Sequence, residues 1–70
     1  MAEVRAEMVA TVWKAVVSEG DAVAEGDVLL VLESMKMEIP VLAESAGTVT
    51  SLAVAEGAVV QEGDLLAVIG

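Results

Sequence analysis

The chain has 70 residues, enough for one small domain whose hydrophobic core only just offsets the entropy of ordering the chain. It contains neither cysteine nor histidine, which excludes disulfides, thiolate metal sites and the commonest general base. Twelve acidic and three basic residues give a net charge of −9, which repels phosphate backbones and anionic lipid and argues against nucleic-acid or membrane binding.

No segment of the sequence has the properties of a membrane span or a secretory signal. No wholly aliphatic run is longer than Val28–Leu32, which is far too short to cross a bilayer. The first residues, Met1–Arg5, lack the basic head and apolar stretch of a signal peptide. We therefore expect a cytoplasmic protein whose acidic residues keep an aliphatic sequence soluble.

Short runs rich in valine and leucine, separated by turn signals, predict an all-β fold. No glycine-free stretch carries the 3.6-residue apolar period of a helix. The expected strands are residues 4–8, 11–17, 22–24, 28–34, 37–42, 48–54, 59–61 and 65–69. Pro40 has no amide donor, so its strand should lie at the edge of a sheet, or its nitrogen should face away from the hydrogen-bonded ladder.

Four glycines mark the turns between these strands, at positions 20, 26, 57 and 63. Each stands where a tight turn calls for a positive φ angle, which glycine adopts at little cost. Their spacing fits neither a dinucleotide-binding motif nor a P-loop, and no helix follows them. A structural role in turns therefore explains them without a ligand.

The two halves of the chain repeat each other. Moved forward by 37 positions, residues 11–33 fall on residues 48–70, and Glu19-Gly20 meets Glu56-Gly57. Two copies of one four-stranded unit predict a flattened β-barrel, or barrel-sandwich hybrid, of two four-stranded antiparallel sheets related by a pseudo-twofold axis. Closing a barrel in this way protects strand edges that would otherwise invite aggregation.

The repeat also suggests which residues form the core. The run Val28–Leu32 does not alternate between apolar and polar residues, so its inward face is ambiguous. Leu29 and Val31 are unchanged in the second copy, as Leu66 and Val68, and we favour them as core residues. The alternative register remains open.

The same shift predicts where Lys36 lies in the fold. Its counterparts in the repeat would fall just before Met1 and just after Gly70. The hairpin that carries Lys36 is thus the pseudo-symmetric counterpart of the chain ends. The lysine and the termini should therefore occupy opposite ends of the barrel.

Lys36 stands between two methionines at a predicted turn. A lysine in such a place is usually only a solvated charge. Met35 and Met37, however, are large apolar side chains, which at an exposed turn are useful to a partner that grips it. They could equally fold back onto the barrel end as core residues, and the sequence leaves both possibilities open.

The sequence around this lysine, E-S-M-K-M at Glu33–Met37, resembles the biotin-attachment motif E-A-M-K-M of biotinyl carrier domains. The likeness continues through Glu38–Val41, Ser45–Val49 and Glu62–Leu66, and Ser34 replaces the usual alanine. It covers nearly the whole chain and is greatest to the short, free-standing biotin/lipoyl attachment proteins of bacteria, especially those of actinobacteria.

The resemblance implies one biotinyl/lipoyl attachment domain over residues 1–70, which serves as a monomeric carrier and not as an enzyme. Lys36 would carry covalent biotin, added by a biotin protein ligase that reads Met35 and Met37, with Glu33 and Ser34 also part of the recognised hairpin. The biotin would shuttle carboxylate between biotin carboxylase and carboxyltransferase. Because an exposed amine is almost wholly protonated at neutral pH, Lys36 is expected to be a substrate of the ligase.

Three other functions compete with this one. A lipoyl carrier, or a protein that accepts both groups, has a similar fold, but the usual lipoyl motif places Asp before the lysine and Ala or Val after it. A structural adaptor would leave Met35, Lys36 and Met37 unexplained. An enzyme would need a convergent acid–base pair, which the sequence does not suggest.

Overall fold

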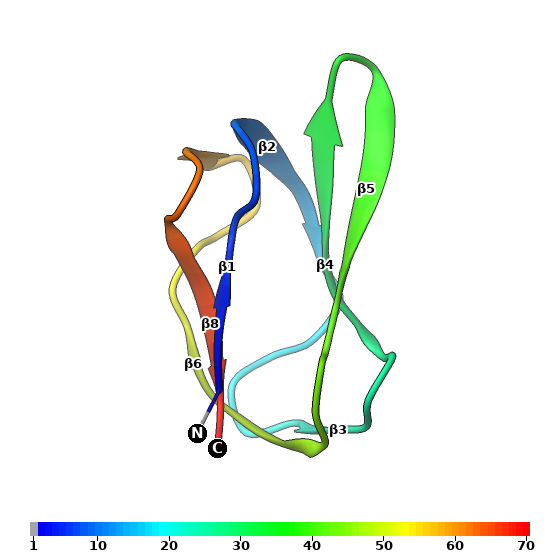
Figure 1. Cartoon of the computed structure of the whole chain (residues 1–70), viewed down its shortest axis with the longest axis vertical. Helices are drawn as coiled ribbons and strands as arrows, with labels where there is room; N and C mark the ends of the chain where they lie inside the picture. The colour runs from blue at the N-terminus through cyan, green and yellow to red at the C-terminus, as the bar shows by residue number, and fades with distance from the viewer. Residues whose placement is uncertain (1) are drawn as a thin grey trace.

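The computed structural model describes residues 2–70, which form eight β-strands (Figure 1). The strands are β1 (Ala2–Arg5), β2 (Ala10–Ala15), β3 (Ala22–Val23), β4 (Val28–Ser34), β5 (Met37–Leu42), β6 (Gly47–Leu52), β7 (Val59–Val60) and β8 (Leu65–Ile69). The all-β prediction is confirmed, and the predicted strands 28–34, 37–42 and 65–69 have the observed bounds. The first strand was placed too late, because beyond Arg5 the chain bonds to a turn: the Ala6 amide donates to the Asp64 carbonyl at 2.9 Å.

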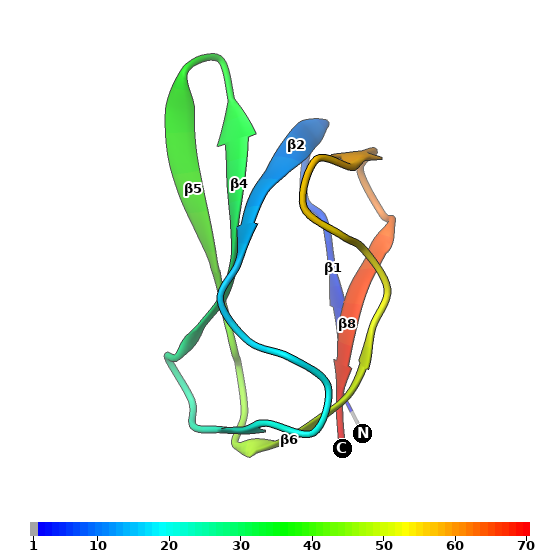
Figure 2. The same ribbon diagram turned by 180° about the vertical axis from the view of Figure 1, so that it is seen from behind.

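The strands form two four-stranded antiparallel sheets that face each other (Figures 1 and 2). Their orders are β1-β8-β6-β3 and β5-β4-β2-β7. Replacing each strand of the first order by the strand four places away in the sequence, β1 by β5, β8 by β4, β6 by β2 and β3 by β7, gives the second order. The predicted pseudo-twofold axis is therefore confirmed. Strand β5, which contains Pro40, is an edge strand, as the missing amide donor predicted.

A β-bulge in β4 explains why its apolar residues do not alternate. Val28 pairs with Leu42 and Leu30 pairs with Val41, so Leu29 is an extra residue on its strand. The bulge lets both Leu29 and Leu30 lie in the core, each fully buried. The pseudo-symmetric strand β8 has the same irregularity opposite β1.

The bulge also decides which of the predicted core residues are correct. Leu29 and Leu66 are fully buried, as the repeat predicted. The prediction for Val31 and Val68 was wrong, because beyond the bulge the alternation is shifted and both side chains are only half-buried. Leu32 is buried in place of Val31. At the bulge, the set of residues that face the core therefore changes from the predicted register to the alternative one.

All four turn glycines have positive φ angles, between 89° and 95°, which confirms the turn prediction. Carboxylates complete these turns. Asp21, Asp27 and Asp64 each accept a hydrogen bond from the backbone amide three residues earlier, at 2.8–2.9 Å. Glu19 accepts from the Leu52 amide and Glu56 from the Ala15 amide, both at 3.0 Å. Part of the acidic composition thus has a structural role beside solubility.

Gly47 lies where two backbone segments approach closely. A Cβ atom there would lie 2.5 Å from the Gly70 carbonyl oxygen and 2.8 Å from Ile69 Cγ2. We therefore expect Gly47→Ala to lower the free energy of unfolding by about 1–3 kcal/mol, the usual cost of overpacking. Urea unfolding measures it, and the exposed Ala46→Ser is the control, expected within about 0.5 kcal/mol of wild type. Equal midpoints for the two variants would contradict the close approach.

Candidate functional site

The lysine lies in the tightest possible hairpin loop, between β4 and β5. Ser34 pairs with Met37, which leaves only Met35 and Lys36 as the loop. Both have positive φ angles, 52° and 65°. Two consecutive residues of this kind are typical of a type I′ turn, whose twist matches that of the flanking strands.

This turn is usually formed by Asn-Gly, and most other residues strain it because their Cβ atom lies close to a backbone carbonyl oxygen. For ordinary residues the left-handed conformation costs roughly 1–2 kcal/mol each. Such strain is commonly found at functional sites, where the shape of the backbone matters. The left-handed conformation of Met35 and Lys36 thus lowers the local stability of the loop.

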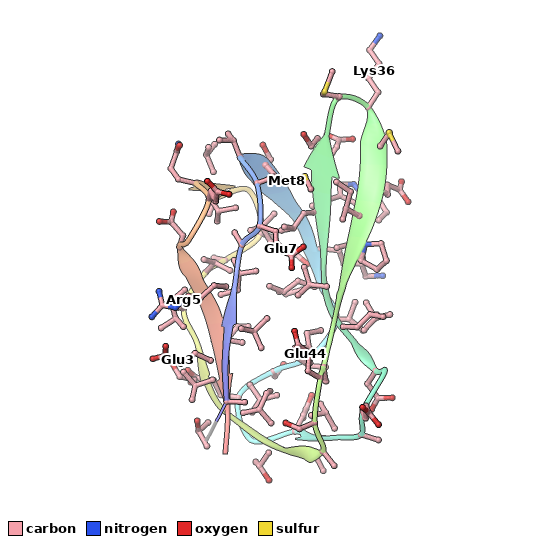
Figure 3. The ribbon with its side chains drawn as sticks, viewed as in Figure 1. Glu3, Arg5, Glu7, Met8, Lys36 and Glu44 are labelled. Atoms are coloured by element: carbon pink, nitrogen blue, oxygen red, sulfur yellow. The ribbon has the colours of Figure 1, made fainter. Side chains whose placement is uncertain are left out.

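The two methionines point into solvent. Met35 is 91% exposed and Met37 is 64% exposed. This decides between the two possibilities that the sequence left open, because neither side chain folds back onto the end of the barrel. Lys36 is also exposed and extends beyond the tip of the hairpin (Figure 3).

The hairpin lies at one end of the long axis of the molecule, and Ala2, the first described residue, pairs with Ile69 at the other end (Figure 1). The molecule measures 31 Å along this axis and 17 Å across it. The geometric prediction from the repeat is therefore confirmed. Nothing in residues 2–70 covers the tip, so a large partner can approach Lys36 from most directions.

The residues that precede the turn are arranged differently from one another. Ser34 is half-buried and closes the loop by pairing with Met37. Glu33 is exposed and lies directly opposite Glu38 on β5. Like charges in this position repel, so the hairpin has a second local cost beside its strained turn. Within residues 2–70, Glu33 makes no side-chain hydrogen bond, and its role in positioning the hairpin remains a prediction.

Reasoning from sequence did not single out Glu38, which lies at the base of the hairpin opposite Glu33. The signal was available, because a two-residue loop at positions 35 and 36 necessarily places residues 33 and 38 opposite each other. The two exposed carboxylates at the base of the hairpin give a partner with basic residues a place to bind.

Among residues 2–70, no ion pair or metal-binding cluster lies beside Lys36. In the described part of the chain the one ion pair joins Arg5 to Glu3 at 2.8 Å, far from the hairpin (Figure 3). No group of three or more metal-binding side chains gathers within residues 2–70. None of these residues belongs to a helix able to cross a membrane. The site thus presents an exposed amine at the tip of the hairpin (Figure 3).

Comparisons with known proteins agree with this arrangement. In Mycobacterium leprae, the "Biotinylated protein TB7.3 homolog" is 71% identical over 41 residues, which make up 59% of this chain and 58% of that protein. The match thus spans less than two thirds of the relative's length.

Two solved structures share the fold. The urea carboxylase of Kluyveromyces lactis superposes over 99% of this chain and 6% of its own, with a TM-score of 0.92 and 36% identity. The lipoyl domain of the 2-oxoglutarate dehydrogenase complex of Azotobacter vinelandii covers 96% of this chain and 95% of its own, with a TM-score of 0.79 and 24% identity. The second likeness shows the fold alone.

The sequence model of the biotin/lipoyl family, described as "Biotin-requiring enzyme", matches residues 2–69. This match covers both sheets and the hairpin between β4 and β5. The chain, with its duplicated half-barrel and exposed hairpin lysine, therefore belongs to the biotin/lipoyl family.

Proposed function

We propose that the chain is a biotin carboxyl carrier and that Lys36 is its biotin attachment site. The observation that carries the proposal is the hairpin tip, where a strained two-residue turn holds the lysine in solvent between two exposed methionines. A protein that needed only a turn would have no reason to keep Met35 and Lys36 in a left-handed conformation. The names of the mycobacterial relatives and the likeness to a urea carboxylase support the same function.

The residues present suit covalent biotin. An amide bond between the Lys36 Nζ and the carboxyl group of biotin needs an unobstructed primary amine, and the tip provides one (Figure 3). When attached, biotin supplies a ureido nitrogen that can accept and release a carboxyl group. The protein's own contribution is to hold the amine at a fixed apex and to offer Met35 and Met37 as apolar surfaces that a biotin protein ligase can grip.

The carrier would work with a biotin carboxylase and a carboxyltransferase. It would act in the cytoplasm as a monomer that consists of one domain. Tethering biotin to a small mobile protein raises its effective concentration at both active sites without any new contact. Catalysis belongs to these partners. Glu33 and Glu38, at the base of the hairpin, suit partner surfaces that carry basic residues near their entrances.

A lipoyl carrier is the alternative within the same family. The fold does not separate the two, since the Azotobacter lipoyl domain superposes well. The residues beside the lysine favour the biotin carrier, because the exposed methionines differ from the Asp and Ala or Val that flank a typical lipoyl lysine. A protein that accepts both groups would gain the mass of biotin when it is incubated with a biotin ligase. It would gain the mass of lipoate when it is incubated with a lipoate ligase.

We expect biotin, ATP and a bacterial biotin ligase to add a single biotin to the chain and none to Lys36→Ala. Intact-mass spectrometry measures the product. The matched control is Lys14→Ala, which removes the other lysine, an exposed residue of β2 that is flanked by no turn, and should label fully. Full labelling of Lys36→Ala would refute the assignment, and lipoate in its place on protein from the native cells would favour the alternative.

A further inference from the structure

An open seam separates the two edge strands β1 and β5, which belong to different sheets and do not pair within residues 2–70. The seam contains a cavity of about 240 Å³. Leu32 and Ile39 line it from the β4–β5 hairpin, and Glu7 and Met8 line it from the segment after β1. We call this space the seam cavity.

The pseudo-twofold axis passes through the seam, since it exchanges β1 with β5. A shift of 37 positions takes Val4 to Val41 and Glu7 to Glu44, and all four residues line the cavity. The two carboxylates thus stand on opposite sides of the seam, at different heights along it (Figure 3). Among residues 2–70 neither Glu7 nor Glu44 makes a side-chain hydrogen bond or ion pair, so both remain free to accept one.

The symmetry is broken at the end of the seam that lies toward the lysine. Ile39 and Met8 line the cavity there, whereas the corresponding residues of the other copy are Ala2 and Ser45. Met8 is 38% exposed and lies on the side of the seam toward the hairpin (Figure 3). The repeat alone does not require larger apolar side chains at this end. Their position suggests a ligand that enters from the direction of Lys36.

We propose that the seam cavity is a resting site for the head group of the biotin carried by Lys36. The bicyclic ring packs against Ile39 and Met8, and a ureido N–H donates to the Glu7 carboxylate. This inference rests on the proposed function, because it requires biotin at Lys36.

The length of the arm permits this contact. Ile39 lies three residues from Lys36 along β5, and a strand rises about 3.3 Å per residue, so the two are about 10 Å apart. The lysine side chain and the alkyl chain of biotin together provide about ten bonds, which in extended form span about 12 Å. Leu42 is about 20 Å from Lys36 on the same basis, and Glu44 follows it. Glu44 is therefore out of reach, although it is the symmetry counterpart of Glu7.

The chemistry of the cavity matches the head group. Biotin has an apolar thioether ring fused to a cyclic urea, which offers two N–H donors and one carbonyl acceptor. Methionine and isoleucine suit the first part, and an ionised carboxylate accepts charge-assisted hydrogen bonds from the second. The cavity is smaller than the roughly 300–1,000 Å³ of sites that enclose drug-sized ligands, as expected for a site that holds only a head group.

The site need not bind tightly. A short tether gives an effective concentration in the millimolar range, so an intrinsic dissociation constant of about 1 mM would keep the arm docked for about half of the time. Such an arm still leaves readily to enter the active site of a partner. The seam would thereby shield biotin between transfers without competing with them.

Methyl NMR of the apo and fully biotinylated chains tests the resting site. Beside Met35 and Met37, which flank the modified lysine, we expect the methyl resonances of Met8 and Ile39 to shift on biotinylation. Glu7→Ala should return the latter two toward their apo positions. The rate of capture by streptavidin should rise about twofold in the same variant, because an arm docked half of the time is released.

Glu44→Ala is the matched control, since it removes the symmetry-related carboxylate that the arm cannot reach. It should leave the Met8 and Ile39 shifts and the streptavidin rate as in wild type. Unchanged Met8 and Ile39 resonances in the fully biotinylated chain would overturn the resting site, and so would equal effects of Glu7→Ala and Glu44→Ala. Mass spectrometry is done first, because a chain that the ligase leaves unmodified overturns the proposed function itself and the resting site with it.

Discussion

Inserting one glycine between Met35 and Lys36 should reduce the rate of biotinylation by on the order of 10²-fold. The insertion keeps every residue of the hairpin but converts the two-residue loop closed by Ser34 and Met37 into a three-residue loop. The amine moves by more than 1 Å, and a displacement of that size in a reacting group can cost this much in rate. A ligase assay with intact-mass detection measures the loss.

The fold should survive the insertion, because the loop contributes no residue to the core. Circular dichroism of the β type should persist, which separates lost recognition from lost structure. Met35→Leu and Met37→Leu keep an apolar side chain of similar volume at the correct position, and both should retain substantial labelling. Biotinylation of the insertion variant at the wild-type rate would mean that Lys36 is merely an accessible amine.

Leu29→Ala should lower the free energy of unfolding by roughly 2–5 kcal/mol. Leu29 is fully buried at the bulge of β4, where the loss of its side chain leaves a cavity that the strands cannot easily fill. A domain of this size has a stability of only about 5–15 kcal/mol, so the variant should be close to unfolding at elevated temperature. Urea unfolding at 25 °C measures the difference.

Lys36→Ala provides the contrast, with an expected change of less than about 0.5 kcal/mol, because the side chain extends into solvent (Figure 3). The pair of variants separates function from stability: Lys36→Ala should abolish labelling and keep the stability, and Leu29→Ala should lower the stability while its folded molecules are still labelled. Comparable unfolding midpoints for the two would contradict the inside–outside assignment of the hairpin and the core.

Much of the fold could be predicted because the sequence states it twice. The repeat and the turn glycines gave the number of strands, the two sheets and the pseudo-twofold axis, and Pro40 marked an edge. The bulges could not be predicted. A bulge adds one residue to a strand without any distinctive residue type, so Val31 was placed in the core although the extra residue Leu29 moves it outward.

The site was predicted in position but not in shape. The repeat placed Lys36 opposite the chain ends, and the motif singled out the residues beside it. Positive φ angles at Met35 and Lys36 were not foreseeable from residue preferences, which disfavour that conformation for both. The exposure of the methionines was equally undecided, since apolar side chains at a strand end can lie in the core or in solvent. Packing across the two sheets decides such questions, and it acts between residues far apart in sequence.

The pairing of the chain ends has a consequence for engineering. Ala2 pairs with Ile69 just as Ile39 pairs with Leu32, its counterpart 37 positions away. A second lysine hairpin, copied from Glu33–Glu38, could therefore join residue 69 to residue 2. The new chain ends would then lie in the exposed turn after Glu56. Such a circular permutant would present a hairpin lysine at either end of a body about 31 Å long.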